Sequence, residues 1–194
     1  MAGRSPEFFP LPRPDLALWL KLSKREQSLN PNFVPRSDDL QNDIGPFELE
    51  GRALWFAPRF YGGEGSAGLG AIGSFGADTL RYEMRYLADV APYAGTAIRL
   101  DGDYLWLGLG FWPEGSMYGV GLLRFNRKSG ETKTFPLPAP VRTIDRLGDT
   151  VVAGTDLGIW ALRDGALTQY RIEPESGGRL GVLTRTITNG GGQP

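Results

Sequence analysis

Cysteine and histidine are both missing from this sequence of 194 residues. Without cysteine the chain forms no disulfide, offers no thiolate nucleophile and builds no zinc ribbon or iron–sulfur cluster. Without histidine it carries no Ser-His-Asp triad, no Cys-His pair and no HExxH zinc site. Catalysis by its own side chains would therefore have to use carboxylates, lysine, tyrosine, serine or threonine.

An excess of one charge and long apolar runs are lacking too. Lys and Arg number 21 against 22 Asp and Glu, so the net charge is −1 and a basic footprint for nucleic acid is missing. The apolar runs are far shorter than the roughly 18 residues needed to span a bilayer, which predicts no membrane span. Residues 1–14 lack the apolar core of a signal peptide, and localisation stays open from the residues alone.

Glycine and aromatic residues are plentiful. The chain has 28 Gly, 15 Pro, 10 Phe, 7 Tyr and 5 Trp, and 41% of its residues are hydrophobic. Gly and Pro together stay just below the roughly 25–30% at which low-complexity disorder is expected. The composition therefore favours a globular fold with many turns.

An internal repeat indicates which fold this is. Segments 46–90, 95–140 and 141–175 each contain four short β-like runs separated by Gly, Asp or Asn turns. Trp55 and Trp106 lie 51 positions apart, and Val152 follows 46 positions later. Four strands in roughly 40–50 residues are typical of a β-propeller blade. We predict an all-β fold, an incomplete β-propeller of about three four-stranded antiparallel blades plus strand remnants; an ordinary β-sandwich is the alternative.

The second and third repeats also resemble a known family. The runs LWLG at 105–108, GLLRF at 121–125 and NRKSGETKTF at 126–135 resemble the two-component regulator propeller repeat, as does the segment 152–159. Residues 54–56 and 70–73 are similar to blades of streptogramin B lyase and its relatives. The resemblance implies blade architecture and a sensory role, usually periplasmic or extracellular. The lyase activity is not implied, because that family depends on a histidine base.

The ends of the chain are predicted to lie outside the three blades. Residues 1–45 are expected to hold an outer-strand remnant and a polar loop, and 176–194 a partial strand and tail, in which 180–187 could begin a further blade. Propellers close with typically four to eight blades. We therefore expect that the chain is part of a longer protein or that copies assemble to complete a ring.

Two glycine-rich loops provide the candidate binding residues. Segments 60–70 and 111–121 both contain an aromatic pair, then Glu-Gly-Ser, then Gly-apolar-Gly, between the second and third strands of their blades. Aromatic faces beside hydrogen-bonding groups suit a carbohydrate or an extended peptide. In the alternative interpretation Phe60 and Phe111 pack in the core and the polar residues only shape turns. The predicted ligand-binding residues are Phe60, Tyr61, Glu64, Ser66, Phe111, Trp112, Glu114, Ser116, Tyr118 and, from the short third loop, Asp156.

Other chemistry in these loops is less well supported. The GxGxxG pattern at 63–68 is followed by strand-like residues, whereas a dinucleotide site needs a helix there. Glu64 and Glu114 could converge as an acid–base pair, which leaves a hydrolase or lyase as an alternative function. The acidic pairs Asp38-Asp39 and Asp101/Asp103 lack the ligand spacing of a calcium loop, so no metal or cofactor is predicted.

The repeat also predicts the core. Eight apolar residues alternate within the strands and recur between repeats: Trp55, Ile72, Phe75, Trp106, Leu122, Phe125, Ile159 and Trp160. The leading function hypothesis is a non-catalytic ligand-binding or protein-interaction module with a sensory role. The alternatives are the carboxylate-dependent enzyme and a structural piece that completes a ring by self-association.

Overall fold

The computed structural model describes residues 41–62, 65–67, 71–87, 93–112, 117–173 and 182–187. Every regular element in these residues is a β-strand, and none is a helix, which confirms the all-β prediction. The described part of the chain accordingly holds no helix that could cross a bilayer.

Three antiparallel sheets follow one another along the chain, and each is built on four strands that come in chain order, as predicted. The first contains β2 (Phe47–Glu50), β3 (Ala53–Phe56), β6 (Ala71–Gly76) and β7 (Arg81–Tyr86). The second contains β8 (Ala94–Asp101), β9 (Tyr104–Phe111), β10 (Tyr118–Asn126) and β11 (Thr132–Pro136). The third contains β12 (Val141–Leu147), β13 (Thr150–Thr155), β14 (Gly158–Arg163) and β15 (Ala166–Glu173). We call these sheets blades 1, 2 and 3.

Four further strands lie outside this pattern. β16 (Val182–Ile187) pairs with β15 as a fifth strand at the outer edge of blade 3, so it does not begin a further blade as expected. β4 (Arg59–Gly62) and β5 (Gly65–Ala67) form a hairpin inside the first glycine-rich loop. β1 (Gln41–Asp43) pairs with β4 and completes a small three-stranded sheet. Residues 1–40, which make up most of the segment predicted to hold an outer-strand remnant and a polar loop, lie outside the described residues.

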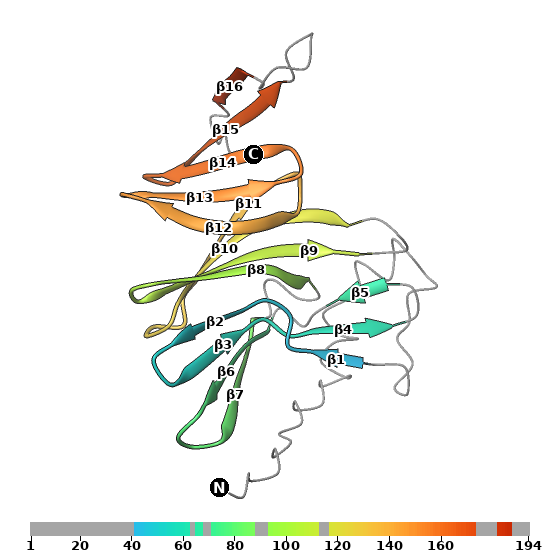
Figure 1. Cartoon of the computed structure of the whole chain (residues 1–194), viewed down its shortest axis with the longest axis vertical. Helices are drawn as coiled ribbons and strands as arrows, with labels where there is room; N and C mark the ends of the chain where they lie inside the picture. The colour runs from blue at the N-terminus through green and yellow to red at the C-terminus, as the bar shows by residue number, and fades with distance from the viewer. Residues whose placement is uncertain are drawn as a thin grey trace, which may run out of the picture.

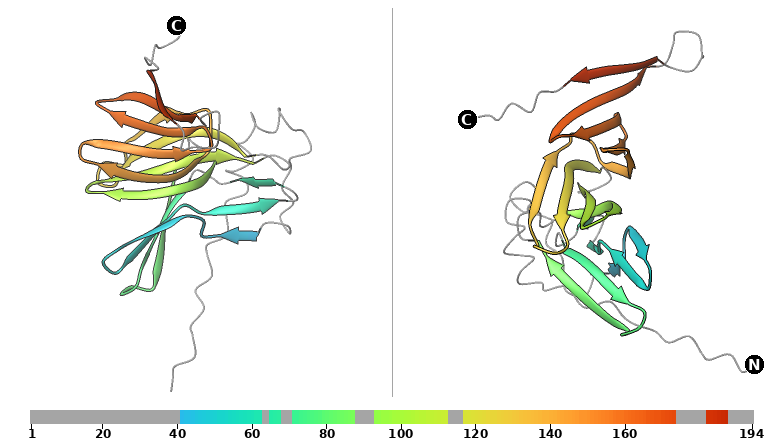
Figure 2. Two further views of the ribbon diagram at one scale, coloured as in Figure 1. Left: turned by 45° about the horizontal axis from the view of Figure 1, so that its top comes forward. Right: turned by 90° about the vertical axis from the view of Figure 1, so that its left-hand side faces the viewer.

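The blades are arranged along an arc (Figure 2). The first strand of each blade, β2, β8 or β12, is an edge of its sheet, and β8 contacts both β2 and β12 (Figure 1). Blade 2 thus lies between blades 1 and 3, with the three inner strands side by side. The arrangement is blade-like and fits neighbouring blades of a propeller, whose inner strands surround a channel; a closed ring is not seen in the described residues.

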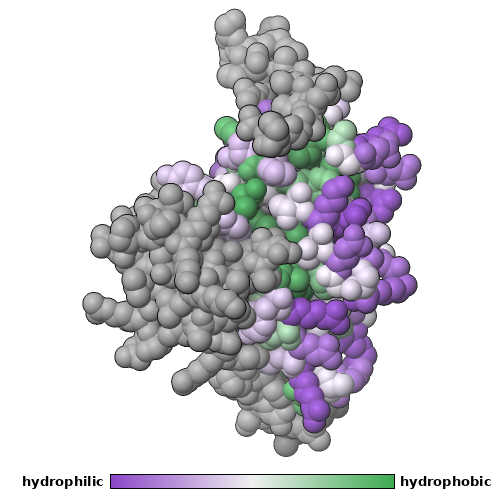
Figure 3. All heavy atoms as spheres, turned by 180° about the vertical axis from the view of Figure 1, so that it is seen from behind, coloured by the Kyte–Doolittle hydropathy of each residue, from purple (hydrophilic) through white to green (hydrophobic). Residues whose placement is uncertain are grey.

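The same tight turn joins the first two strands of every blade. The pairs Glu50/Ala53, Asp101/Tyr104 and Leu147/Thr150 close two-residue turns. The first turn residue is always glycine, with φ of 57°, 57° and 58° at Gly51, Gly102 and Gly148. Glycine adopts this left-handed conformation without steric strain, and such turns suit the twist of a hairpin. These turns lie along a hydrophilic edge of the molecule, seen on the right in Figure 3.

Two apolar clusters join the blades. The cluster between blades 1 and 2 includes Ile72, Leu107 and Phe125, each no more than 1% exposed. The cluster between blades 2 and 3 includes Trp106, Leu122 and Trp160. Blade 2 therefore buries both of its faces, because strand residues alternate between the two sides of a sheet. Burial of such side chains contributes roughly 1.5–3 kcal/mol each.

These clusters contain most of the predicted core. Ile72, Trp106, Leu122, Phe125 and Trp160 are buried, whereas Trp55, Phe75 and Ile159 are half-buried. Two of these exceptions, Phe75 and Ile159, are explained by the face of the sheet on which the residue lies. Phe75 pairs with Leu54 on the face of blade 1 that points away from blade 2, and Ile159 lies on the face of blade 3 that points away from blade 2.

Candidate functional site

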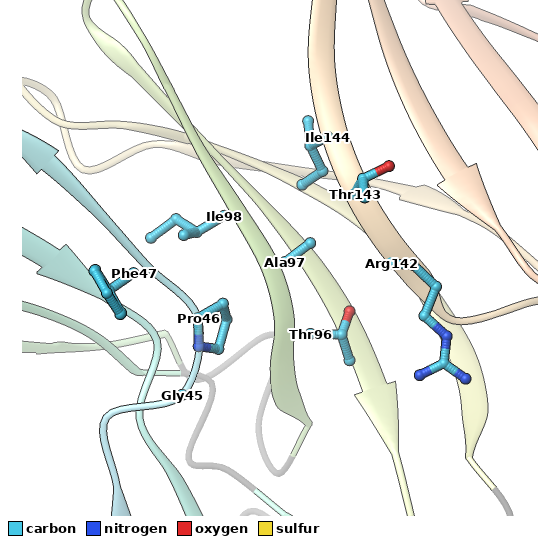
Figure 4. Close-up of a pocket in the computed structure, with 9 residues that line it drawn as sticks. All are labelled: Gly45, Pro46, Phe47, Thr96, Ala97, Ile98, Arg142, Thr143 and Ile144. Carbon is cyan, nitrogen blue, oxygen red and sulfur yellow. The ribbon is translucent and has the colours of Figure 1, made fainter.

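A hollow of about 390 Å³ opens where the three inner strands meet. Each blade contributes one segment near the start of its inner strand: Gly45–Phe47, Thr96–Ile98 and Arg142–Ile144. In Figure 4, Pro46 and Phe47 lie on one side, Arg142 and Thr143 on the other, and the β8 residues between them. A volume of this size lies within the range of small-molecule sites. No single blade could form it.

Arg142 is the charged residue that lines this hollow. Its guanidinium donates two hydrogen bonds to the Asp156 carboxylate, Nε–Oδ1 at 2.9 Å and Nη2–Oδ2 at 2.7 Å. A bidentate pair of this kind has a fixed geometry. The hydrogen bonds and charge of Arg142 lower the pKa of Asp156, and those of Asp156 raise the pKa of Arg142. Both groups are therefore ionised at neutral pH, and the pair has no net charge.

Hydrogen bonds of two side chains, Thr155 and Gln169, hold the turn that carries Asp156 in place. Thr155 Oγ1 donates to the Gly158 carbonyl at 2.8 Å and accepts from the Leu157 amide at 3.2 Å. The side-chain amide of Gln169, a buried polar residue on β15, donates to the Leu157 carbonyl at 2.8 Å. These bonds fix the β13–β14 turn, so Asp156 meets Arg142 in one orientation.

The second glycine-rich loop borders the hollow on the Arg142 side. Arg142 Nη1 lies 3.5 Å from the sulfur of Met117, directly before β10. Of the residues predicted in this loop, Trp112 and Tyr118 are exposed, Tyr118 by 58%. Phe111 is buried at the end of β9, a strand whose residues are buried from Leu105 onward, which fits the alternative interpretation of Phe111 as a core residue.

The remaining predicted residues are described only in part. Phe60 and Tyr61 lie on β4, and Ser66 on β5 pairs with Tyr61. Glu64, Glu114 and Ser116 lie outside the described residues, and the proposed convergence of the two glutamates lies there with them. Because Gly65–Ala67 is a strand, a helix does not begin directly after the third residue of the GxGxxG pattern.

One residue further along each inner strand, charged side chains connect all three blades. Arg99 on β8 lies between two acids, with Nη1 3.2 Å from Glu48 Oε1 and Nη2 3.5 Å from Asp145 Oδ1. Glu48 also accepts a hydrogen bond from the Leu100 backbone amide. This charged layer separates the hollow from the hairpin turns. In the described residues, no group of three or more acidic side chains is placed to hold a metal ion.

The hollow and the charged layer were not predicted, although the repeat contains a signal for them. Glu48, Arg99 and Asp145 each precede their repeat's anchor residue, Trp55, Trp106 or Val152, by seven positions. Equal spacing from equivalent anchors places side chains at the same height on neighbouring blades. The sequence does not show which side chains of neighbouring inner strands point toward one another. This orientation is what makes Arg99 the partner of Glu48 and Asp145.

The sequence matches no protein-family model, and a search of curated proteins finds no match. The similarity to regulator propellers therefore stays a prediction that depends on the residues quoted above.

Proposed function

We propose that the chain is a non-catalytic binding module whose ligand occupies the hollow between the three inner strands. The observation that carries this proposal is the joint lining of the hollow by equivalent segments of three blades, with the Arg142–Asp156 pair at its rim. Binding residues are often found where a rigid scaffold presents loops and strand ends.

The lining favours a neutral ligand with hydroxyl groups and apolar faces. The Arg142–Asp156 pair offers donors and acceptors without net charge, and Thr143 adds a hydroxyl. Pro46 and Phe47 provide apolar surface on the opposite side, and Phe47 is 60% exposed. Sugar rings combine hydroxyl edges with apolar faces, so we assign a carbohydrate as the ligand class.

The residues of the hollow do not support acid–base catalysis. A general acid and a general base must both reach the reacting atoms. Among the described residues, Arg142 is the one ionisable group of the lining, and arginine stays protonated in proteins. Binding is therefore the chemistry that this lining can provide.

Titration with neutral oligosaccharides, followed by isothermal calorimetry, tests the proposal. Arg142→Met removes the donors at the rim and should weaken binding about tenfold or more, the usual effect of losing a charged hydrogen bond. Thr143→Val removes one hydroxyl and should weaken binding less. Arg163→Met is the matched control, because Arg163 is exposed on the β14–β15 hairpin and does not line the hollow.

Equal affinity of the wild-type protein and Arg142→Met would reject the hollow as the site. If extended peptides bind in an Arg142-dependent manner and oligosaccharides do not, the hollow is supported and the carbohydrate class is rejected. If neither class of probe binds, the proposal fails.

A further inference from the structure

The inner hairpins of the three blades can be compared position by position. Each has the same two-residue turn, and cross-strand pairing then aligns the positions without ambiguity. The last residue of the inner strand is Glu50 in blade 1, Asp101 in blade 2 and Leu147 in blade 3. We call this the final position, and the residue before it the penultimate position.

Blade 1 carries apolar residues where the following blades contact their predecessors. Phe47 is equivalent to Ile98 and Ile144, which belong to the two clusters between blades. Leu49, at the penultimate position, is equivalent to Leu100, which packs in the cluster between blades 1 and 2. Yet Phe47 is 60% and Leu49 68% exposed. Blade 1 thus has the surface that receives a preceding blade, and no such blade covers it in the described part of the chain.

Both internal interfaces place an acid at the final position beside an arginine of the next blade. Glu50 of blade 1 pairs with Arg127 of blade 2, with Arg127 Nη2 2.9 Å from Glu50 Oε1. Asp101 of blade 2 pairs with Arg146 of blade 3, which occupies the penultimate position. Each acid therefore has a cation from the following blade.

At the two open faces, the final position of blade 3 and the penultimate position of blade 1 are both leucine. Blade 3 has Leu147 at its final position, 76% exposed, and blade 1 has Leu49 at its penultimate position. A blade 1 placed after blade 3 would bring Leu49 to Leu147, as Arg146 is brought to Asp101. Leucines thus take the place of both the acid and the cation, so each open face carries an apolar residue that would contact the leucine of the other face. Ile159, equivalent to the buried Ile72 and Leu122, adds apolar surface to the open face of blade 3.

We propose that a second copy of this chain docks on these faces, with blade 1 of each copy against blade 3 of the other. The described blades of two copies number six, within the four to eight at which propellers close. The head-to-tail contact occurs twice, so the ring has no open face. Glu48 and Asp145 become neighbours in this ring, each already paired with Arg99 of its own chain.

Exchanging the leucines for the ion pair of the internal interface tests the contact. The wild-type chain should sediment at twice its mass of 21.2 kDa, with dissociation on dilution. Leu49→Arg or Leu147→Asp alone places an unpaired charge in the contact and should raise the dimer dissociation constant roughly tenfold or more. The double variant recreates the Asp101–Arg146 arrangement and should recover most of the affinity.

Leu80→Arg is the matched control, because Leu80 is an exposed leucine in the β6–β7 turn, away from the inner strands. Circular dichroism of each variant tests whether its monomer is folded. A wild-type monomer at all concentrations overturns the proposal. So does an oligomer that both single variants leave unchanged, or a double variant no tighter than the singles. Neither leucine lines the hollow, although Phe47 belongs both to its lining and to the docking face, so a failed association test leaves ligand binding to be judged by the Arg142 variants.

Discussion

Thr96 shows how one polar group can be placed at an energetic disadvantage. Its Oγ1 is buried, and no hydrogen-bond partner for it is present in the described part of the chain. It lies over Gly108, where a Cβ would be 2.6 Å from this oxygen and 2.7 Å from Val141 Cβ. Because Gly108 has no side chain, β8, β9 and β12 approach closely, and the hydroxyl is enclosed between them.

Thr96→Val should therefore raise the free energy of unfolding by about 1 kcal/mol. The substitution keeps the shape and removes a buried hydroxyl, whose desolvation costs roughly 1–3 kcal/mol when it is unpaired. Urea denaturation measures the change. Gly108→Ala is the opposite case, because its Cβ would meet Thr96 and Val141, and it should lower stability by about 1–3 kcal/mol. A Thr96→Val protein less stable than wild type would contradict the account of Thr96.

Individual residues were easier to predict as core than as site. Trp106 and Phe125 are buried as their alternation predicted. For Phe111 the sequence allows either a ligand contact or a core position, because it shows an aromatic pair without showing where the strand stops, and the residue is buried at the end of β9. Asp156 lies at the rim of the hollow, as a predicted site residue. Its partner Arg142, which fixes the orientation and the charge state of Asp156, belongs to no recognisable motif.

At the scale of the elements, neighbouring strands are joined by charges that only the assembled blades bring together. The Arg127 guanidinium lies 5.1 Å from the Trp55 ring centre and pairs with Glu50. It also donates to the carbonyl of Gly102, in the first turn of its own blade. One side chain at the end of β10 thus links the inner hairpins of blades 1 and 2.

This link makes stability depend on pH in the acid range. The hydrogen bonds and charge of Arg127 lower the pKa of Glu50 below its ordinary value. The stabilisation is present above the unfolded-state pKa, about 4, and is lost as the pH falls through the lower folded-state pKa. When the pH is lowered from 5 to below the folded-state pKa of Glu50, the wild-type protein should lose more unfolding free energy than Glu50→Gln.

Guanidinium denaturation at several pH values measures this difference. The control is the Arg127→Met background, in which Glu50 has lost its partner and Glu50→Gln should no longer change the pH dependence. If the difference persists without Arg127, another group is responsible for the pKa of Glu50.

The twelve blade strands were accessible from the sequence, whereas β1, β4, β5 and the pairing of β16 were not. Alternation and Gly-containing turns determine each blade locally, which explains the agreement for β8 to β15. β4 and β5 lie in a segment that glycine content made look like a loop, and β4 pairs with Gln41–Asp43, far away in sequence. β16 was expected as a strand, but its attachment to β15 depends on which sheet edge is free.

At the scale of the whole molecule, stability should depend on protein concentration. Association of the open faces of blades 1 and 3 stabilises the folded state by mass action, so the melting temperature should rise with concentration. The Leu49→Arg variant should melt at one temperature over the same range. Differential scanning calorimetry at several concentrations compares the two. A wild-type melting temperature independent of concentration would contradict the association.

The charged layer on the inner strands also bears on aggregation. β2, β8 and β12 are sheet edges, and an uncovered edge offers its amides and carbonyls to a strand of another chain. Here Glu48 already occupies the Leu100 amide, and Arg99 and Asp145 place charge along the neighbouring edges. An intruding strand would have to displace the carboxylate and desolvate these ions. The residues that join the blades thereby discourage misassembly of the chain.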